Sequence, residues 1–466
     1  MSKRMLIILL GIAVFTSIVM LITFNYWDGQ TLMVWSVNIY DILAEGNIRD
    51  FYVYTQMNLR GAIHADGCSS PFMLIPQMIW NLPIWLTHYF NGNLDIVTLP
   101  CLYWYKLFLL IVTGLSGFVC YKIAYQMTDD KKKGLWSFLL VVASAETILS
   151  TMYTGQDEIV YLFFILAALY SILNDKKKAF IVWSTCAITC YPIMLIPFLT
   201  IELLSEKKLW KLIRDSIITL SPTILWAVIS WGAEAKEKVS IDSSIYIDEV
   251  LNINTIALPT GLGSVFTILM VFILFGCYYT NLKGVTDETS DYERKRTLIW
   301  YMSLSMALIS FAMYNDFYRL LLYVPLVVIL ILARKEEDNT SIGLFLLMIM
   351  SYTRMFAGGY DDPQNINTIY VIKHKWIMAI CNITGSTKYD VYDGLYPKIV
   401  EKLPVLANFV TVANAISVVG ILLVLYIFYP KQKKMFDFPI SSKVSVVLYT
   451  LCMPLLMMVF FALLFK

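Results

Sequence analysis

Long apolar runs alternate with short polar segments along almost the whole chain. A helix that crosses the hydrocarbon core of a bilayer needs about 20 mainly apolar residues. About eleven runs approach that length, and we expect each of them to form a membrane-spanning helix. They cover residues 5–24, 101–125, 135–152, 158–174, 216–232, 262–281, 297–314, 319–333, 341–358, 405–429 and 444–465.

Two further apolar segments, 71–90 and 180–204, are interrupted by prolines. We expect 71–90 to be an interfacial element within a long outer loop. Pro192 and Pro197 break the second segment, and we expect it to form a hairpin of two half-helices that returns to its starting side. Irregular backbone is tolerated at membrane depth only where protein or a water-filled cavity covers it. The hairpin therefore indicates the neighbourhood of a site.

Basic clusters stand between the predicted spans. Cytoplasmic loops of membrane proteins are enriched in Lys and Arg, and a cytoplasmic N-terminus with an outer C-terminus places every cluster inside, at 131–133, 176–178, 207–211, 294–296 and 431–434. The large loops 25–100, 233–261 and 359–404 then lie outside. The prediction is an all-α, polytopic transmembrane fold in the cell membrane, with about eleven full spans plus the hairpin and an active site on the extracytoplasmic face.

Composition narrows the class further. Hydrophobic residues make up 58% of the 466 positions and charged residues 15%, against about 25% charged in soluble domains. These values exclude a soluble multidomain protein and a disordered chain. The net charge of +2 lacks the excess of basic residues that is typical of nucleic-acid-binding proteins. The 8 cysteines lack the spacing of a zinc site and of a disulfide framework.

Acidic residues open the first outer loop. Asp28 follows the first span within a few residues, next to Tyr26 and Trp27. A carboxylate at the membrane surface suits a general base that meets a lipid-borne substrate, although a solvated acid beside an aromatic belt is the simpler alternative. Asp41 and Glu45 are four residues apart and share a face if this segment is helical.

Another polar group, Gln156, Asp157 and Glu158, occupies a short outer turn. Its side chains are suited to binding sugar hydroxyls or a metal, whereas the alternative is a polar turn that merely cannot enter the bilayer. Glu146 lies inside the preceding predicted span. An ionisable residue at that depth is costly and is treated as a functional-site hypothesis. The alternative is a structural ion pair with Lys106, another charged residue within a predicted span.

Two arginines stand near the outer ends of late spans, Arg319 and Arg354. A guanidinium group stays charged at any relevant pH and offers a planar fork of donors to a phosphate. The pair is therefore suited to hold a lipid phosphate. The alternative is that both side chains reach to native headgroups.

Three stretches together resemble the GT-C superfamily of integral membrane glycosyltransferases. They are Asp28 with the acidic segment 41–46, the turn 155–158 followed by the proline-broken hairpin, and the segment 318–325 that holds Arg319. The resemblance covers most of residues 1–335, which we expect to form the catalytic core including outer loop 25–100. Residues 336–466 would form the C-terminal transmembrane helices with outer loop 359–404.

The resemblance implies a mannosyltransferase-like, inverting enzyme that moves a sugar from a polyprenyl-phosphate donor to a glycan or glycolipid acceptor. Asp28 would act singly as the general base. Because arginine can neutralise a monophosphate leaving group, the resemblance implies no metal, and no cofactor besides the polyprenyl-phosphate donor. Asp41, Glu45, Gln156, Asp157 and Glu158 would bind substrate, and Arg319 and Arg354 the lipid phosphate. The expected partners are the lipid-linked donor, the acceptor and membrane lipids, and no nucleic acid.

Two other classes remain open. A transporter or flippase of lipid-linked saccharides is also polytopic and typically has broken helices in matched halves, whereas the sequence predicts one break, at Pro192 and Pro197. A polymerase of lipid-linked saccharides also carries large outer loops, but we expect such an enzyme to place arginines in a late outer loop. Loop 359–404 contains none.

Overall fold

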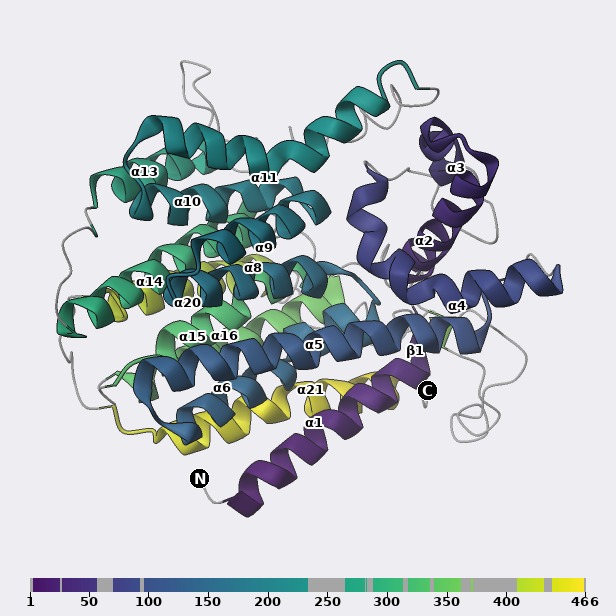
Figure 1. Ribbon diagram of the computed structural model, residues 1–466. Coiled ribbons are helices and arrows are strands. Elements are labelled where there is room, and N and C mark those ends of the chain that lie inside the picture. Colours follow the sequence, from purple (N-terminus) through teal and green to yellow (C-terminus); the bar gives the residue numbers. More distant parts are fainter. Residues whose placement is uncertain are drawn as a thin grey trace. The chain divides into compact units, whose positions relative to one another are not determined.

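The computed structural model describes residues 3–25, 27–56, 70–92, 96–233, 265–280, 282, 288–312, 317–335, 339–361, 370–371, 409–430 and 438–464. Within these ranges the chain is helical, apart from one two-residue antiparallel pairing of β1 (Phe24–Asn25) with β2 (Tyr370–Val371). The all-α class predicted from the sequence is confirmed for this part of the chain (Figure 1).

The α-helices are α1 Lys3–Thr23, α2 Trp27–Glu45, α3 Phe51–Gln56, α4 Ile75–Asn91, α5 Leu99–Thr128, α6 Lys131–Val142, α7 Ala145–Ile148, α8 Glu158–Leu173, α9 Lys177–Cys190, α10 Leu195–Ser205, α11 Leu209–Ile229, α13 Val265–Tyr279, α14 Glu288–Ala312, α15 Val324–Leu332, α16 Thr340–Asp361, α20 Phe409–Ile427 and α21 Ser442–Leu464. Short 3₁₀ turns are η1 Ile48–Asp50, η3 Pro71–Leu74, η5 Pro192–Met194 and η6 Phe317–Leu322, and η4 Leu149–Tyr153 is a π-helical turn.

Contacts group the chain into two compact units that interleave along the sequence. Unit 1 comprises Met1–Tyr26, Thr113–Ile159 and Tyr314–Lys466, and unit 2 comprises Trp27–Val112 and Val160–Met313. The division into a catalytic core, 1–335, and a C-terminal part, 336–466, concerns function and stays a prediction.

Unit 1 is built around α16, which packs against α15, α20 and α21. The α16–α20 contact depends on glycine, because a Cβ atom on Gly343 would lie 2.6 Å from the ring of Phe428. Small residues allow helix backbones to approach closely in this way. Helix α1 packs along α21, and α15 is buried along its whole length.

Unit 2 contains the predicted hairpin. Helix α9 ends at Cys190, η5 begins with Pro192, and α10 continues from Leu195. The rings of Phe180 and Phe198 stack at 5.6 Å, so α10 runs back along α9. The break occurs at Pro192, whereas Pro197 lies within α10, and the placement of this segment as a hairpin in a membrane stays a prediction.

The loops predicted to be cytoplasmic lie together within each unit. In unit 1 the Lys133 ammonium donates to the carbonyls of Arg334 and Lys335, joining the start of α6 to the end of α15. In unit 2 Lys207 donates to the Cys277 carbonyl at 2.8 Å, and Arg294 pairs with Asp175 at 2.9 Å. The predicted layout requires these loops to share one end of their unit.

Three helices of the described residues are long and apolar enough to cross a membrane: Lys3–Ile22, Leu99–Thr128 and Leu209–Ile229. A fourth candidate, 131–153, is bent by 44°. The bend occurs where Ser144 caps α7 by accepting a hydrogen bond from the Thr147 amide at 2.9 Å. The sequence pattern predicted one continuous span over 135–152. The other apolar helices are shorter, and the count of eleven spans stays a prediction.

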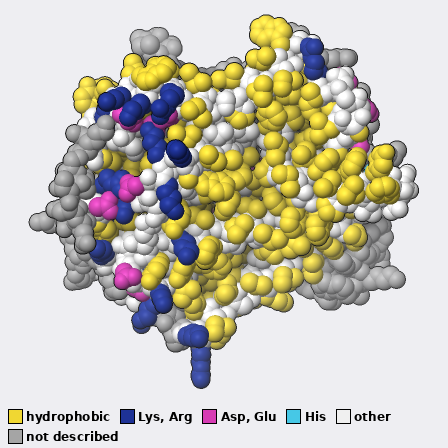
Figure 2. All heavy atoms as spheres, viewed as in Figure 1, with side chains coloured by type: hydrophobic (Ala, Val, Ile, Leu, Met, Phe, Trp, Pro, Cys, Tyr) yellow, Lys and Arg dark blue, Asp and Glu magenta, His cyan; other side chains and the backbone are white. Residues whose placement is uncertain are grey.

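Hydrophobic side chains cover most of the face drawn in Figure 2, whereas Lys and Arg gather along its left edge. Helix α11 illustrates the pattern, since Trp210, Ile217 and Val228 are exposed, as is Trp231 just after the helix. Contiguous exposed apolar surface of this kind marks contact with lipid or with another protein. Together with the apolar helices, it supports a membrane protein.

Candidate functional site

The acidic residues of the first outer loop lie on α2. The segment is helical, as the i, i+4 spacing required, and Asp41 and Glu45 occupy its last two turns. The indole of Trp85 on α4 donates to Asp41 Oδ1 at 2.9 Å, and the hydroxyl of Tyr54 on α3 donates to Glu45. Both carboxylates are therefore held by aromatic donors on neighbouring helices of unit 2.

The Tyr54–Glu45 contact has a measurable signature. The hydrogen bond to Glu45, with smaller effects of burial and of the nearby carboxylates, raises the pKa of Tyr54 to about 12. The donor is thus the neutral phenol over the whole physiological range. Asp28 lies in the first turn of α2, and its side chain falls outside the described residues.

The second predicted group lies in unit 1, between η4 and α8. Gln156 and Glu158 are buried and Asp157 is half-buried. The backbone N–H of Gln156 donates to the Ser150 carbonyl at 2.9 Å, and the Ser150 hydroxyl donates to Glu158 Oε2 at 3.5 Å. The turn therefore folds back onto the π-helical turn η4 instead of projecting into solvent.

Arg319 and Arg354 stand on η6 and α16 of unit 1, with side chains outside the described residues. Their elements contact one another, and both contact α7. The π-helical turn η4 also packs against η6. The backbone of unit 1 thus brings the two arginine positions and the 156–158 turn onto elements that pack together, whereas Asp28, Asp41 and Glu45 belong to unit 2.

The centre of these contacts is Glu146 on α7, which is 0% exposed. The hydroxyl of Ser351 on α16 donates to its Oε1 atom. Tyr449 on α21 lies beside it, so three elements meet at this carboxyl group. The sequence analysis selected Glu146 because it lies inside a predicted span. It could not select Ser351 and Tyr449, since hydroxyl side chains are common in membrane helices.

Unit 2 contains a large apolar cavity of about 920 Å³ beside the broken hairpin. This volume lies at the upper end of the range for ligand pockets, about 300–1,000 Å³. Its walls come from α4, α9 and α11, with Ile75, Ile79, Cys186, Thr189, Ile217 and Leu225 among the lining residues. The cavity is where the irregular backbone at Pro192 predicted that a site would lie.

Aromatic side chains connect this cavity to the acidic helix. Phe72, which lines the cavity, packs edge-on against Trp226 at 5.9 Å. The Trp226 indole donates to the Tyr52 hydroxyl at 2.8 Å, and Tyr54 on the same short helix reaches Glu45. One end of the apolar cavity therefore adjoins the element that carries the predicted substrate-binding carboxylates.

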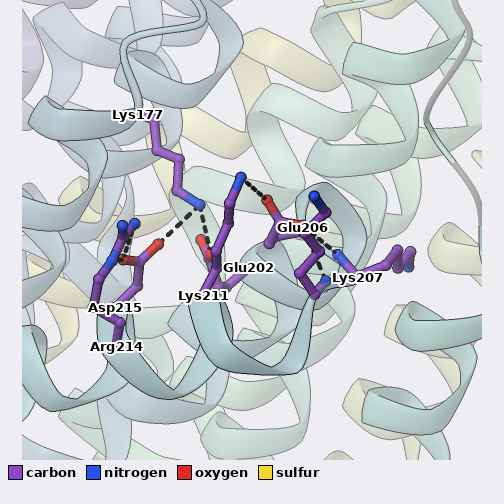
Figure 3. A network of polar contacts seen from close by, with 8 residues as sticks. Lys177, Glu202, Glu206, Lys207, Lys211, Arg214 and Asp215 are labelled. Carbon is purple, nitrogen blue, oxygen red and sulfur yellow. Dashed lines mark hydrogen bonds and ion pairs between the residues drawn. The ribbon is translucent and has the colours of Figure 1, made fainter.

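At the basic end of unit 2, a charged network ties the hairpin to α11 (Figure 3). Lys177, at the start of α9, lies 2.7 Å from Glu202 Oε1 and 2.9 Å from Asp215 Oδ2. Both carboxylate side chains are 0% exposed, whereas Lys177 is 35% exposed. Burial disfavours the ammonium ion, but the hydrogen bonds and charges of the two carboxylates outweigh it and raise the pKa of Lys177.

Arg214 completes the network by pairing with Asp215 at 2.7 Å, and Lys211 pairs with Glu206 at 3.2 Å. Sequence reasoning used these basic residues for orientation only. Glu202 and Asp215 could have indicated this network, because each is an acid near the inner end of an apolar run, but the sequence analysis did not use them.

Comparison of the chain with protein-family models, with curated proteins and with solved structures found no match in any of the three. The resemblance to the GT-C superfamily therefore rests on the residue pattern. No group of three or more His, Cys, Asp or Glu side chains suited to a metal occurs within the described ranges.

Proposed function

We propose that the chain is a membrane glycosyltransferase that moves a sugar from a polyprenyl-phosphate donor to a glycan or glycolipid acceptor on the outer face of the membrane. The observation that carries the proposal is the apolar cavity of unit 2. A polyprenyl chain is long and purely hydrocarbon, and burial of apolar surface is the interaction that would retain it.

The neighbours of the cavity fit this substrate. Its wall includes η3 and α4, which belong to the predicted outer loop, and α9, which precedes the break at Pro192. The aromatic contacts of Trp226 lead from the cavity to α3 and then to Glu45 on α2. A lipid chain in the cavity would therefore hold its polar head towards carboxylates that can accept hydrogen bonds from sugar hydroxyls.

Asp28 is the proposed base. Its position in the first turn of α2 is one where the helix dipole favours a negatively charged side chain. Asp28 would take the proton of the acceptor hydroxyl while that oxygen attacks the anomeric carbon and the lipid phosphate leaves. Arg319 and Arg354 would offset the negative charge that develops on the phosphate.

The first test replaces Asp28 by Asn and measures sugar transfer from polyprenyl-phosphate donors in membranes. Removing a general base lowers kcat by about 10²–10⁴-fold, and we expect KM for the donor to change little. Asp130→Asn is the matched control, because Asp130 caps α6 and Asn caps a helix equally well. A folded Asp28→Asn protein with undiminished transfer would remove Asp28 from the mechanism.

The second test uses a native thiol in the cavity. Cys186 is half-buried and lines the cavity, whereas Cys101 is half-buried elsewhere in unit 2. We expect polyprenyl phosphate to slow alkylation of Cys186 several-fold and to leave Cys101 unaffected, measured by peptide mass spectrometry. Equal alkylation of Cys186 with and without the lipid contradicts the assignment of the cavity.

A transporter of lipid-linked saccharides is the second candidate, because a specific observation favours it. Besides the hairpin break at Pro192, the chain breaks at Ser144, where α6 and α7 meet at an angle. Discontinuous helices are typical of transporters. Movement of a lipid-linked sugar across vesicles by the purified protein, without sugar transfer, would favour this candidate over the enzyme.

A further inference from the structure

Glu146 is a buried carboxyl group that the proposed mechanism does not use. It stands on α7, directly after the break that separates this short helix from α6. The next element, η4, is a π-helical turn. Such turns are rare and occur frequently at functional sites, and the break places the backbone of this segment out of register with a continuous span.

The hydrogen bonding of Glu146 is incomplete among the described residues. Oε1 accepts from the Ser351 hydroxyl, whereas Oε2 is buried and has no hydrogen-bond partner there. The hydroxyl group of Tyr449 is buried beside Glu146 and is within reach of Ser144 and Ser351. Oε2 of Glu146 can therefore take part in one further hydrogen bond, and the Tyr449 hydroxyl group lies beside it.

A proton satisfies this arrangement. An ionised carboxylate in an apolar interior is very unfavourable unless it is paired, and in proteins such a group becomes neutral instead. A neutral carboxylic acid has one O–H donor, and the Tyr449 oxygen is an available acceptor. Ser351 already donates to the other oxygen, as a hydroxyl can to a neutral acid.

Charged groups that could interact with Glu146 come from the elements packed against α7. The packed elements are α6, η4, η6, α16 and α21. Tyr449 and Cys452 of α21 interact with Glu146. The other titratable or charged residues on or next to these elements are Asp130, Lys131, Lys132 and Lys133 at the far, basic end of α6, Tyr153, Tyr318, Arg319, Tyr323, Tyr352, Arg354, Tyr360, Asp361 and Lys443.

We propose that Glu146 is a proton-binding site in the apolar interior of unit 1, which holds its proton at neutral pH and releases it in strongly alkaline solution. In this site the O–H bond of Glu146 breaks on release and the proton passes to water, leaving the carboxylate with the Ser351 and Tyr449 hydroxyls. Buried acids of this kind form proton relays in pumps and transporters. The site would make unit 1 sensitive to pH whether the chain is an enzyme or a transporter.

The test is carbodiimide labelling of the purified full-length protein in lipid nanodiscs. Dicyclohexylcarbodiimide enters apolar regions and reacts with protonated carboxyl groups to give an N-acylurea adduct, which peptide mass spectrometry assigns to a residue. We expect the adduct at Glu146 near neutral pH and a decrease of about tenfold or more in strongly alkaline buffer. Glu158→Gln is the matched control, because it removes another buried acid and leaves Glu146 in place.

Three results overturn the proposal. If Arg319 or Arg354 forms an ion pair with Glu146, the carboxyl group is ionised and no adduct forms near neutral pH. If sodium chloride, but not choline chloride, protects Glu146 from labelling, the site binds a sodium ion instead of a proton. If the wild-type protein lacks an infrared band of a protonated carboxyl group near neutral pH, the acid is not neutral. All three measurements use the wild-type protein, so the test does not require any variant to fold.

Discussion

The two units bury acidic side chains in opposite ways. In unit 2, Glu202 and Asp215 share the ammonium group of Lys177, and Arg214 adds a second cation to Asp215. In unit 1, the described partners of Glu146 are hydroxyl groups. The first arrangement pairs the buried carboxyl groups with cations at the edge of an apolar region, whereas the second offers hydroxyl groups alone and favours a neutral acid. Side chains of the same class therefore serve as a structural clamp in one region and as an exchangeable site in the other.

The clamp should produce the largest effect. Lys177→Met leaves Glu202 without its cation, and breaking a buried pair by removing one partner costs about 3–5 kcal/mol. We expect about 3 kcal/mol of lost unfolding free energy, because Lys177 is 35% exposed and solvent weakens the interaction. Thermal unfolding in detergent measures the change, with exposed Lys178→Met as the control. Equal stability of the two variants would show that the clamp is not needed.

Glu146→Gln should have a smaller effect. The amide has the shape of the neutral acid, accepts from Ser351 and keeps a donor for Tyr449, so we expect a loss of less than about 1 kcal/mol. The same thermal unfolding measurement applies. A loss as large as that of Lys177→Met would mean that Glu146 is ionised and paired, and the contrast between the two units would disappear.

The exposed pair Tyr54–Glu45 should give the smallest effect. The pKa of a free tyrosine side chain is about 10, and the hydrogen bond raises the pKa of Tyr54 to about 12. A group whose folded pKa is raised stabilises the fold fully below its unfolded value and loses that contribution as the pH rises from 10 towards 12. The difference between the tyrosinate absorbance titrations of wild type and Tyr54→Phe should show one phenol with a midpoint near 12. A midpoint near 10 would contradict the hydrogen bond.

Local pattern predicted a large part of the fold. Apolar runs identified the positions of most helices, and Pro192 identified the turn between α9 and α10 because proline has no amide hydrogen for the helix ladder. The break at Ser144 was not predicted, since serine continues a membrane helix as readily as it caps a new one. The hydrogen bond from the Thr147 backbone amide to Ser144, which forms only in the folded chain, distinguishes a helix cap from a continuing helix.

The candidate site was less accessible to sequence reasoning. The spacing of Asp41 and Glu45 predicted a shared helical face, but their donors Trp85 and Tyr54 come from other helices. Likewise, Ser351 lies 205 residues from Glu146 in the sequence. Partners brought together by tertiary packing leave no periodic signal in one chain.

The glycine at position 343 has a consequence for the site as well as for packing. Ser351 lies on α16, two turns beyond Gly343, and its hydroxyl reaches Glu146 from there. Any side chain at Gly343 would meet the ring of Phe428 and the side chain of Ile331, and α16 would have to shift or rotate to accommodate it. The alignment of the Ser351 hydroxyl with the buried acid is therefore set, at a distance, by a position where the chain carries only a hydrogen atom.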